Sequence, residues 1–268
     1  MLASRFSIPI WLTLLTLGGV TSASAADLTL LPPPAPIYSG WYLRGDIGFS
    51  NQRVDSLYNP AYSGYSWVTN VDKGFDAAPI FDLGIGYQVN NWLRFDVTGE
   101  YRGKANFHGL DIGVPLGGVT SIDDRYTASK SEWTFLFNSY IDLGTWYNVT
   151  PFVGAGIGTS RNTISNFGNV GIHYQSDTNF ETGSKWSFAW AIYAGLGYQV
   201  SPNLTVELAY RYIDLGDAIT GTGVSYDGAY TWAPFEFHHL TSNDIRIGLR
   251  FNLYSPHEYA PPPIPSKG

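Results

Sequence analysis

Residues 244–253 read DIRIGLRFNL and alternate polar or small side chains with apolar ones. Successive side chains of an extended strand point to opposite faces, so Ile245 and Ile247 would share one face while Arg246 and Arg250 share the other. A strand that is apolar on one face and charged on the other is typical of a barrel with lipid outside and a polar interior. This stretch therefore predicts a transmembrane β-barrel.

Seven further segments show the same alternation. They lie at residues 40–50, 78–89, 92–102, 131–147, 151–159, 186–200 and 204–214. The connections alternate between long (51–76, 103–130, 160–185, 215–240) and short (90–91, 148–150, 201–203). An even-stranded barrel with both termini in the periplasm produces this order. We therefore predict an all-β, eight-stranded antiparallel up-and-down barrel in the outer membrane, with four long extracellular loops and both termini periplasmic.

The N-terminal residues predict export. Arg5 precedes an apolar run at 6–20 that ends in Ala23-Ser24-Ala25, which is the pattern of a cleaved signal peptide. The run is shorter than the ~20 residues that a membrane-spanning helix needs. The predicted organisation is a signal peptide at 1–25, a proline-rich periplasmic lead at 26–39, the barrel at 40–254 and a proline-rich periplasmic tail at 255–268.

The composition separates a membrane barrel from a soluble β-sandwich. Aromatic residues make up 16% of the chain, charged residues only 14%, and glycines number 30. Lipid-facing barrels use aromatics at both membrane interfaces, whereas a soluble sandwich would carry more charge outside. The net charge is −7, and removal of Arg5 with the signal would make it −8, which argues against a nucleic-acid partner. The chain has no cysteine, which excludes disulfides and thiolate chemistry.

The inward faces of the predicted strands carry a nearly balanced set of charges, with six arginines, eight carboxylates and no lysine. They are Arg44, Asp46, Asp82, Arg94, Asp96, Glu100, Arg102, Glu132, Asp142, Glu207, Arg211, Asp244, Arg246 and Arg250. The planar guanidinium suits fixed carboxylate pairs. Since eight strands leave just enough room for side chains, we predict a paired network that closes the lumen. The alternative is a narrow pore along the same charges.

The histidines give little support for catalysis. His108, His173, His238, His239 and His257 are all predicted off the strands, and no nucleophile motif accompanies them. We therefore predict no catalytic residues, no enzyme activity and no cofactor.

One loop cluster has a second interpretation. His238 and His239 lie beside Trp232, Phe235 and Phe237 and could hold haem or a transition metal, although a solvated pair is the alternative. The loop aromatics could also contact a host protein. They are Tyr58, Tyr62, Tyr65, Trp67, Tyr226, Tyr230 and Trp232.

The whole predicted mature chain resembles the small outer-membrane β-barrel proteins of alphaproteobacteria, a porin-like family that includes major surface antigens and haemin-binding proteins. The motifs that carry the resemblance are Ala26-Asp27-Leu28, Pro32-Pro33-Pro34-Ala35-Pro36, Ser39 to Gly48, Gly154-Ala155-Gly156-Ile157-Gly158, Ala194-Gly195-Leu196-Gly197-Tyr198 and Glu207-Leu208-Ala209-Tyr210-Arg211-Tyr212. One departure is the proline-rich tail after Phe251 and Tyr254, since members usually end on the aromatic residue of the last strand.

The resemblance implies a structural role in the envelope. In such proteins an Ala-Asp start looks like the acceptor for covalent attachment to peptidoglycan, with Ala26 supplying its α-amine and Asp27 forming part of the recognition. A proline lead would act as a stiff spacer. We therefore predict a barrel, surrounded by outer-membrane lipid, that supports envelope integrity and is tethered to peptidoglycan. The alternatives are a small porin, or a surface protein that binds haem or a host ligand through its loops.

Overall fold

The computed structural model describes residues 39–118, 121–172 and 176–253. The predicted signal peptide, the tail and all but the last residue of the lead lie outside this part of the chain, as do Ala26 and Asp27. The described residues belong to a single compact unit and are almost entirely strand.

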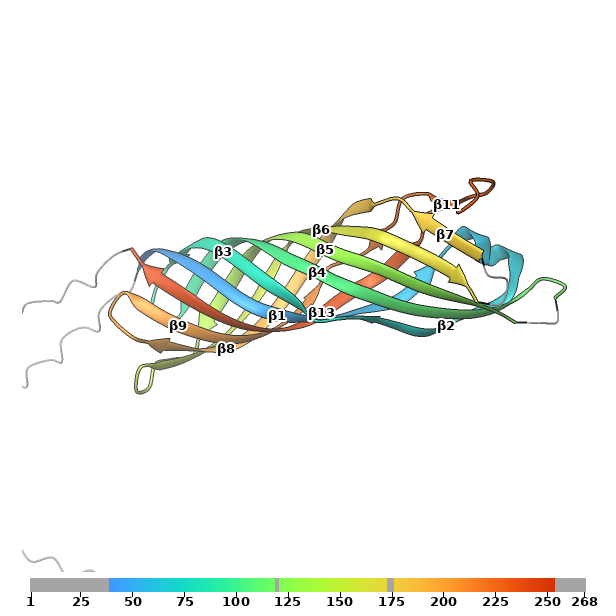
Figure 1. Cartoon of the computed structure of the whole chain (residues 1–268). Coiled ribbons are helices and arrows are strands. Elements are labelled where there is room, and N and C mark those ends of the chain that lie inside the picture. The colour runs from blue at the N-terminus through green and yellow to red at the C-terminus, as the bar shows by residue number, and fades with distance from the viewer. Residues whose placement is uncertain (1–38, 119–120, 173–175, 254–268) are drawn as a thin grey trace, which may run out of the picture. The chain divides into compact units, whose positions relative to one another are not determined.

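Eight of the strands close into a ring in chain order, each antiparallel to its two neighbours (Figure 1). They are β1 (Gly40–Tyr58), β3 (Ala78–Gln88), β4 (Leu93–Pro115), β5 (Ile122–Asp142), β6 (Val149–Gly171), β8 (Gly183–Gln199), β9 (Leu204–Asp214) and β13 (Glu236–Asn252). The last strand, β13, pairs back onto β1 with Tyr42 opposite Asn252, which closes the ring. The predicted eight-stranded up-and-down barrel is confirmed.

The two ends of the ring differ. At one end, here called the turn end, the chain reverses within residues 89–92, 143–148 and 200–203. The other end, here called the loop end, carries the remaining elements, which are the 3-10 helix η1 (Pro60–Gly64), β2 (Tyr65–Phe75), β7 (Ser176–Phe180), β10 (Ala218–Ile219), β11 (Gly223–Ser225) and β12 (Thr231–Trp232). No helix among the described residues is long and apolar enough to cross a membrane.

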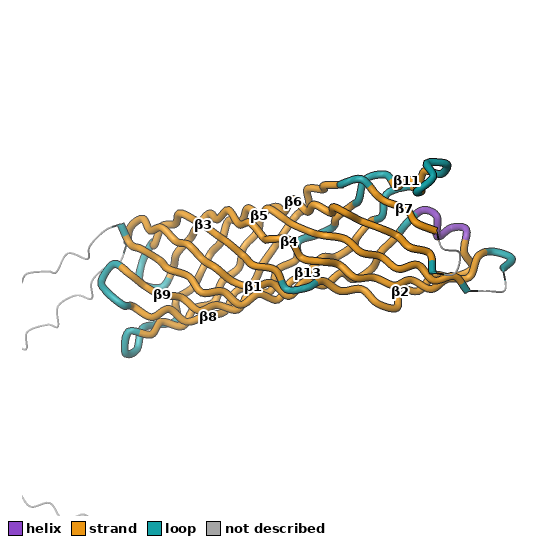
Figure 2. The backbone as a smooth tube through the Cα atoms, in the orientation of Figure 1, coloured by secondary structure: helices purple, strands orange, loops and turns teal. Residues whose placement is uncertain are grey.

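The structure has strand over much of the length of the predicted long loops, so this part of the prediction is wrong. Of the predicted loop at 103–130, β4 occupies the residues up to Pro115 and β5 those from Ile122. Likewise β1 continues to Tyr58 and β6 to Gly171, so Figure 2 shows strand running far into the loop end. For β4 the failure follows from a shift in the inside–outside parity of the strand. On β4 the residues facing inward change from Arg102 to Ala105 across a bulge, which breaks the alternation in the sequence.

At the turn end, the fourth ring strand is shorter than predicted. It ends at Asp142 and not at Tyr147, because the backbone turns through three residues with positive φ. Gly144 has a φ of 112°, Tyr147 of 51° and Asn148 of 66°. A strand cannot continue through this conformation, whereas a tight turn requires it.

A band of exposed apolar side chains surrounds the middle of the ring. Leu83 on β3 is 75% exposed, and Ile47, Phe137 and Ile247 are exposed on three other strands. Aromatic pairs lie towards both sides of this band. Trp41 packs edge-on against Tyr87 with 5.4 Å between ring centroids, and Tyr101 lies 5.0 Å from Trp133. Such a band with flanking aromatics matches the hydrocarbon layer and its two interfaces.

Strand β5 shows where the band ends. Within the band Phe135 and Phe137 face outward while Asn138 is buried inside. Nearer the loop end the faces exchange character, since Tyr126 is buried inside while Arg125 is exposed outside. The ring strands therefore leave the apolar layer and continue into water.

Candidate functional site

All fourteen predicted charged residues lie inside the ring, and none is more than 7% exposed. Their side chains form a network of ion pairs, here called the charged lumen. It occupies the part of the barrel that the apolar band surrounds.

Two arginines and two carboxylates form the centre of the charged lumen. Both terminal nitrogens of the Arg102 guanidinium donate to the Asp244 carboxylate, at 3.1 and 2.7 Å. Its Nε donates to Glu100 at 2.7 Å. Arg211 donates to the same two carboxylates, to Asp244 at 2.8 Å and to Glu100 at 2.7 Å. Because β4 is not a ring neighbour of β9 or β13, the bonds from Arg102 to Asp244 and from Arg211 to Glu100 cross the lumen.

A second group of pairs adjoins this centre. Arg44 donates to Asp46 at 2.9 Å and to Asp96 at 2.9 Å, and it also donates to the Tyr140 hydroxyl at 2.8 Å. Arg246 pairs with Asp82 and lies 3.2 Å from Asp46. Each arginine therefore joins carboxylates from different strands, which fixes the strands relative to one another.

Towards the turn end, the network of ion pairs continues through Glu207. Its carboxylate lies 3.4 Å from Arg94 and 3.0 Å from Arg250. Arg94 also pairs with Asp142 at 3.2 Å, and its guanidinium lies 4.2 Å from the centre of the Tyr140 ring. A planar cation over an aromatic face gains a further attraction where water is excluded. The lumen is thus filled by side chains as far as the last turns.

Lysine is present in the lumen, contrary to the prediction. The Lys130 side chain is fully buried, pairs with Glu132 and donates to Gln52 at 2.8 Å. Lys130 raises the six expected cations to seven, against eight carboxylates. It was missed because the predicted strand began at residue 131, one position too late.

Two glycines make room for this network. A Cβ atom at Gly248 would lie 2.1 Å from Oδ1 of Asp46, and one at Gly86 would lie 2.2 Å from the Tyr42 ring. Any side chain at these positions would displace a member of the lumen.

Nearer the loop end the interior becomes aromatic. Phe237 on β13 is fully buried, with ring centroids 5.2 Å from Phe107 and 5.9 Å from Phe167. Phe167 in turn lies 4.9 Å from Phe235. This cluster is here called the aromatic plug, and its members are Phe75, Phe107, Tyr126, Phe167, Phe180, Phe235 and Phe237. The aromatic plug fills the interior at a second level, nearer the loop end than the charged lumen. Inward aromatics at alternate positions of the presumed loops were the feature that could have revealed it.

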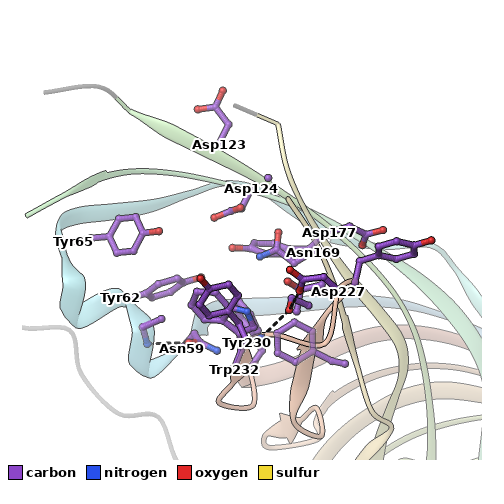
Figure 3. A pocket seen from close by; sticks show the side chains of 18 residues that line it. Asn59, Tyr62, Tyr65, Asp123, Asp124, Asn169, Asp177, Asp227, Tyr230 and Trp232 are labelled. Atoms are coloured by element: carbon purple, nitrogen blue, oxygen red, sulfur yellow. Dashed lines mark hydrogen bonds between the residues drawn. The ribbon is translucent and has the colours of Figure 1, made fainter. Parts of the chain in front are cut away.

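A pocket of about 540 Å³ opens above the aromatic plug, and it is here called the outer pocket (Figure 3). Its aromatic residues are Tyr62, Tyr65, Tyr126, Phe180, Tyr226, Tyr230, Trp232 and Phe235. Its charged residues are Asp123, Asp124, Asp177 and Asp227. Five of the predicted contact aromatics (Tyr62, Tyr65, Tyr226, Tyr230 and Trp232) are therefore brought together, while Tyr58 and Trp67 are not among the lining residues.

Burial raises the pKa of two carboxyl groups in this region. It raises the pKa of Asp124, and the neighbouring Asp111 carboxyl adds to the effect. Burial also raises the pKa of Asp111, although the Tyr62 hydroxyl and the Asn70 amide donate to it and act in the opposite direction. Of the carboxylates that line the pocket, Asp124 therefore lies in surroundings that disfavour its negative charge, so a cation bound beside it would offset part of that cost.

The predicted histidine cluster does not form as expected. His238 and His239 lie on strand β13 and His108 on β4, so the prediction that none lies on a strand is wrong. His238 Nε2 is 3.3 Å from Glu236, whereas Phe235 and Phe237 point to the other side, into the aromatic plug. The described residues contain no group of three or more histidine and carboxylate side chains arranged for a metal. His173 and His257 lie outside them.

Comparison with known proteins identifies the family to which this chain belongs. The model of the family described as the outer membrane protein β-barrel domain matches residues 12–237. The chain belongs to this family. The resemblance to small alphaproteobacterial outer-membrane barrels is confirmed, and the protein lies in the outer membrane.

The relatives of this outer-membrane barrel include proteins of Brucella and Rickettsia. An uncharacterized protein of Brucella suis is 32% identical over 238 residues, which cover 78% of this chain and 80% of the relative. A protein of Rickettsia prowazekii named "Putative adhesin" is 28% identical, with 80% of this chain and 87% of the relative covered. The crystal structure of OprG from Pseudomonas aeruginosa covers 80% of this chain and 97% of its own, with 14% identity and a TM-score of 0.48.

Proposed function

We propose that this outer-membrane protein is a closed barrel that binds ligands at the cell surface through its loop end, while the charged lumen fixes the arrangement of the strands in the membrane-spanning part. The observation that carries the proposal is the filling of the interior at two levels, with a pocket beyond them. A closed interior argues for a scaffold, and a pocket on a rigid scaffold argues for recognition.

The lumen argues against the alternative of a small porin. Arg102 and Arg211 bind Glu100 and Asp244 across the lumen, and all four side chains are at most 1% exposed. Eight-stranded barrels are just wide enough for side chains to fill, whereas aqueous channels belong to larger barrels. The aromatic plug forms a second barrier, nearer the loop end than the charges.

The loop end supports recognition in three ways. Its strands continue beyond the apolar band with polar residues outside, so they would project into the medium. The outer pocket is concave and rich in aromatic residues, as binding sites generally are. The Rickettsia relative carries the name of an adhesin, which suits a surface-binding role for this chain as well.

Two measurements test the proposal together. In planar bilayers the purified protein is expected to give no conductance steps, and steady channels would overturn the closed barrel. Displayed on a heterologous Gram-negative bacterium, the protein is expected to increase attachment to mammalian cells. Attachment should fall in the variant Tyr226→Ala/Tyr230→Ala/Trp232→Ala and persist in Trp146→Ala, an exposed aromatic of the turn end. Equal attachment with and without the protein would contradict surface binding.

A tether to peptidoglycan is a second candidate, favoured by the place where the first and last ring strands meet. The first and last ring strands meet at the turn end, where the Leu253 amide donates to the Trp41 carbonyl at 2.9 Å. If the loop end faces outward, the segments before β1 and after β13 both begin on the periplasmic side. Ala26 and Asp27 could then reach the cell wall.

The tether is tested on the wall itself. Sacculi boiled in detergent, then digested with trypsin and muramidase, are expected to yield the peptide Ala26–Arg44 joined to a muropeptide by mass spectrometry. The same peptide found only with a free amine, in the detergent-soluble fraction, would discard the covalent link.

A further inference from the structure

We propose that the outer pocket binds an alkyl polyamine, a linear organic cation whose ammonium groups are separated by methylene chains. The inference rests on the proposed surface-binding function and names the class of ligand.

The charge of the outer pocket points to a cation. Among the eighteen described residues that line it, four are aspartates and none is lysine, arginine or histidine. In the charged lumen each carboxylate lies beside a cationic side chain. The carboxylates of the outer pocket, in contrast, share it with no cationic residue among its described lining residues. An anionic ligand would meet four carboxylates and no donor side chain with positive charge. Haem, which carries two propionates, is therefore disfavoured here.

The aspartates come from separate elements. Asp123 and Asp124 lie on β5, Asp177 on β7, and Asp227 in the turn between β11 and β12. In the view of Figure 3, Asp123 and Asp124 lie above the aromatic residues and Asp177 lies to the side away from Tyr65. Carboxylates on three separate elements suit several ammonium groups along one chain better than a single charge.

The aromatic residues suit the methylene segments. Tyr62, Tyr230 and Trp232 line the pocket beside the carboxylates, and Phe235 joins it to the aromatic plug. Aromatic faces attract ammonium groups and offer apolar surface to the carbons between them. A hydrated metal ion would gain nothing from this apolar surface.

One buried polar atom of the pocket without a hydrogen-bond partner among the described residues is an acceptor. The Asn169 side chain bonds to Asp124, while its own Oδ1 is buried and has no hydrogen-bond partner among the described residues. Ammonium groups are donors only, so they complement carboxylate and amide oxygens.

The size of the pocket agrees with this class. Its volume of about 540 Å³ lies within the range of roughly 300–1,000 Å³ that is common for small-molecule sites. A single ammonium ion would leave most of it empty.

Calorimetry on the full-length protein in lipid nanodiscs, with spermidine as the probe, tests the proposal. We expect saturable binding that weakens between about 50 and about 500 mM salt, because salt screens ion pairs near the surface. The variant Asp124→Asn/Asp177→Asn should bind at least about tenfold more weakly, as expected when charge-assisted hydrogen bonds are removed. The variant Trp232→Ala should also bind more weakly. The control Asp72→Asn removes an exposed carboxylate of the loop end outside the pocket and should bind as the wild type does.

Three results would overturn the inference. They are the absence of saturable spermidine binding in correctly folded wild type, an equal loss in Asp72→Asn, and preferential binding of a neutral oligosaccharide or haem. Folding is checked independently by the heat-dependent shift of the barrel in electrophoresis. Surface attachment without spermidine binding would reject only the ligand class, whereas conductance or the lack of attachment would reject the proposed function itself.

Discussion

The charged lumen and the aromatic plug are enclosed by the same strands but are filled in opposite ways. Strand β5 contributes Glu132 and Asn138 to the first region and Tyr126 to the second. The difference follows from the surroundings of the barrel wall. Within the apolar band only the interior can hold polar side chains, whereas beyond it water solvates the outer face and the apolar side chains turn inward.

The two interiors also stabilise the protein differently. Removing charges from water costs free energy that their pairing only offsets, so the charged lumen chiefly fixes which strand arrangement is formed. The aromatic plug gains free energy from apolar burial and dispersion, without specific partners. Damage to the first region should therefore be felt throughout the barrel, and damage to the second near the loop end.

The largest effect is expected from Arg102→Leu. The change leaves Asp244 and Glu100 short of a buried partner, and loss of one partner of a buried pair costs about 3–5 kcal/mol. The free energy of unfolding, measured by urea titration in micelles, should fall by that amount. The exposed Arg125→Leu serves as the control and should change it by less than about 0.5 kcal/mol. Equal losses would show that the lumen pairs do not set stability.

A smaller and more local effect is expected from Phe237→Ala. The change removes a fully buried ring between Phe107 and Phe167, and such cavities cost about 3 kcal/mol. Hydrogen exchange should accelerate in the loop-end parts of β4, β6 and β13 but not within the apolar band. Trp67→Ala, at an exposed aromatic of the same end, should leave exchange unchanged. Acceleration throughout the barrel would contradict two independently stabilised interiors.

The pH dependence distinguishes two loop-end carboxylates. Because burial raises the folded-state pKa of Asp124, its stabilising contribution is complete below its unfolded pKa and is lost as the pH rises through the folded pKa. For Asp217, burial is outweighed by hydrogen bonds from Lys185 and the His239 amide, which lower the pKa, so its contribution is lost as the pH falls.

Substitution by asparagine should therefore act in opposite directions. Compared with the wild type, Asp124→Asn should gain less protection from hydrogen exchange on acidification from neutral pH, and Asp217→Asn should gain more. The comparison requires exchange rates corrected for intrinsic pH dependence. If both variants shift in the same direction, the assignment of the two environments is incorrect.

The smallest effect is expected from Lys185→Gln. Its ammonium pairs with Asp217 at 3.0 Å, but both side chains are more than 30% exposed. Ion pairs screened by water contribute less than about 1 kcal/mol, so the urea midpoint should barely move. A loss as large as that of Arg102→Leu would remove the distinction between buried and exposed pairs.

Sequence alternation identified much of this architecture and failed at definable places. The fourteen charged positions of the lumen could be read from single strands, because a period of two assigns each side chain to one face. The aromatic plug was missed where bulges shift that period. On β13 both His238 and His239 lie between the inward Phe237 and Leu240, and His239 has a positive φ of 52°. Read as sequence, such segments look like polar loops.

The sequence alone determined which face of each ring strand meets lipid, because only one assignment keeps charges out of the hydrocarbon layer. It also determined the order of the strands, since short turns join neighbours. Only the tertiary structure decided that Arg102 and Arg211 share Glu100 and Asp244, because strand tilt and register set which side chains meet across the lumen. The outer pocket was decided in the same way. Its aspartates come from segments far apart in the chain, and no local pattern records their approach.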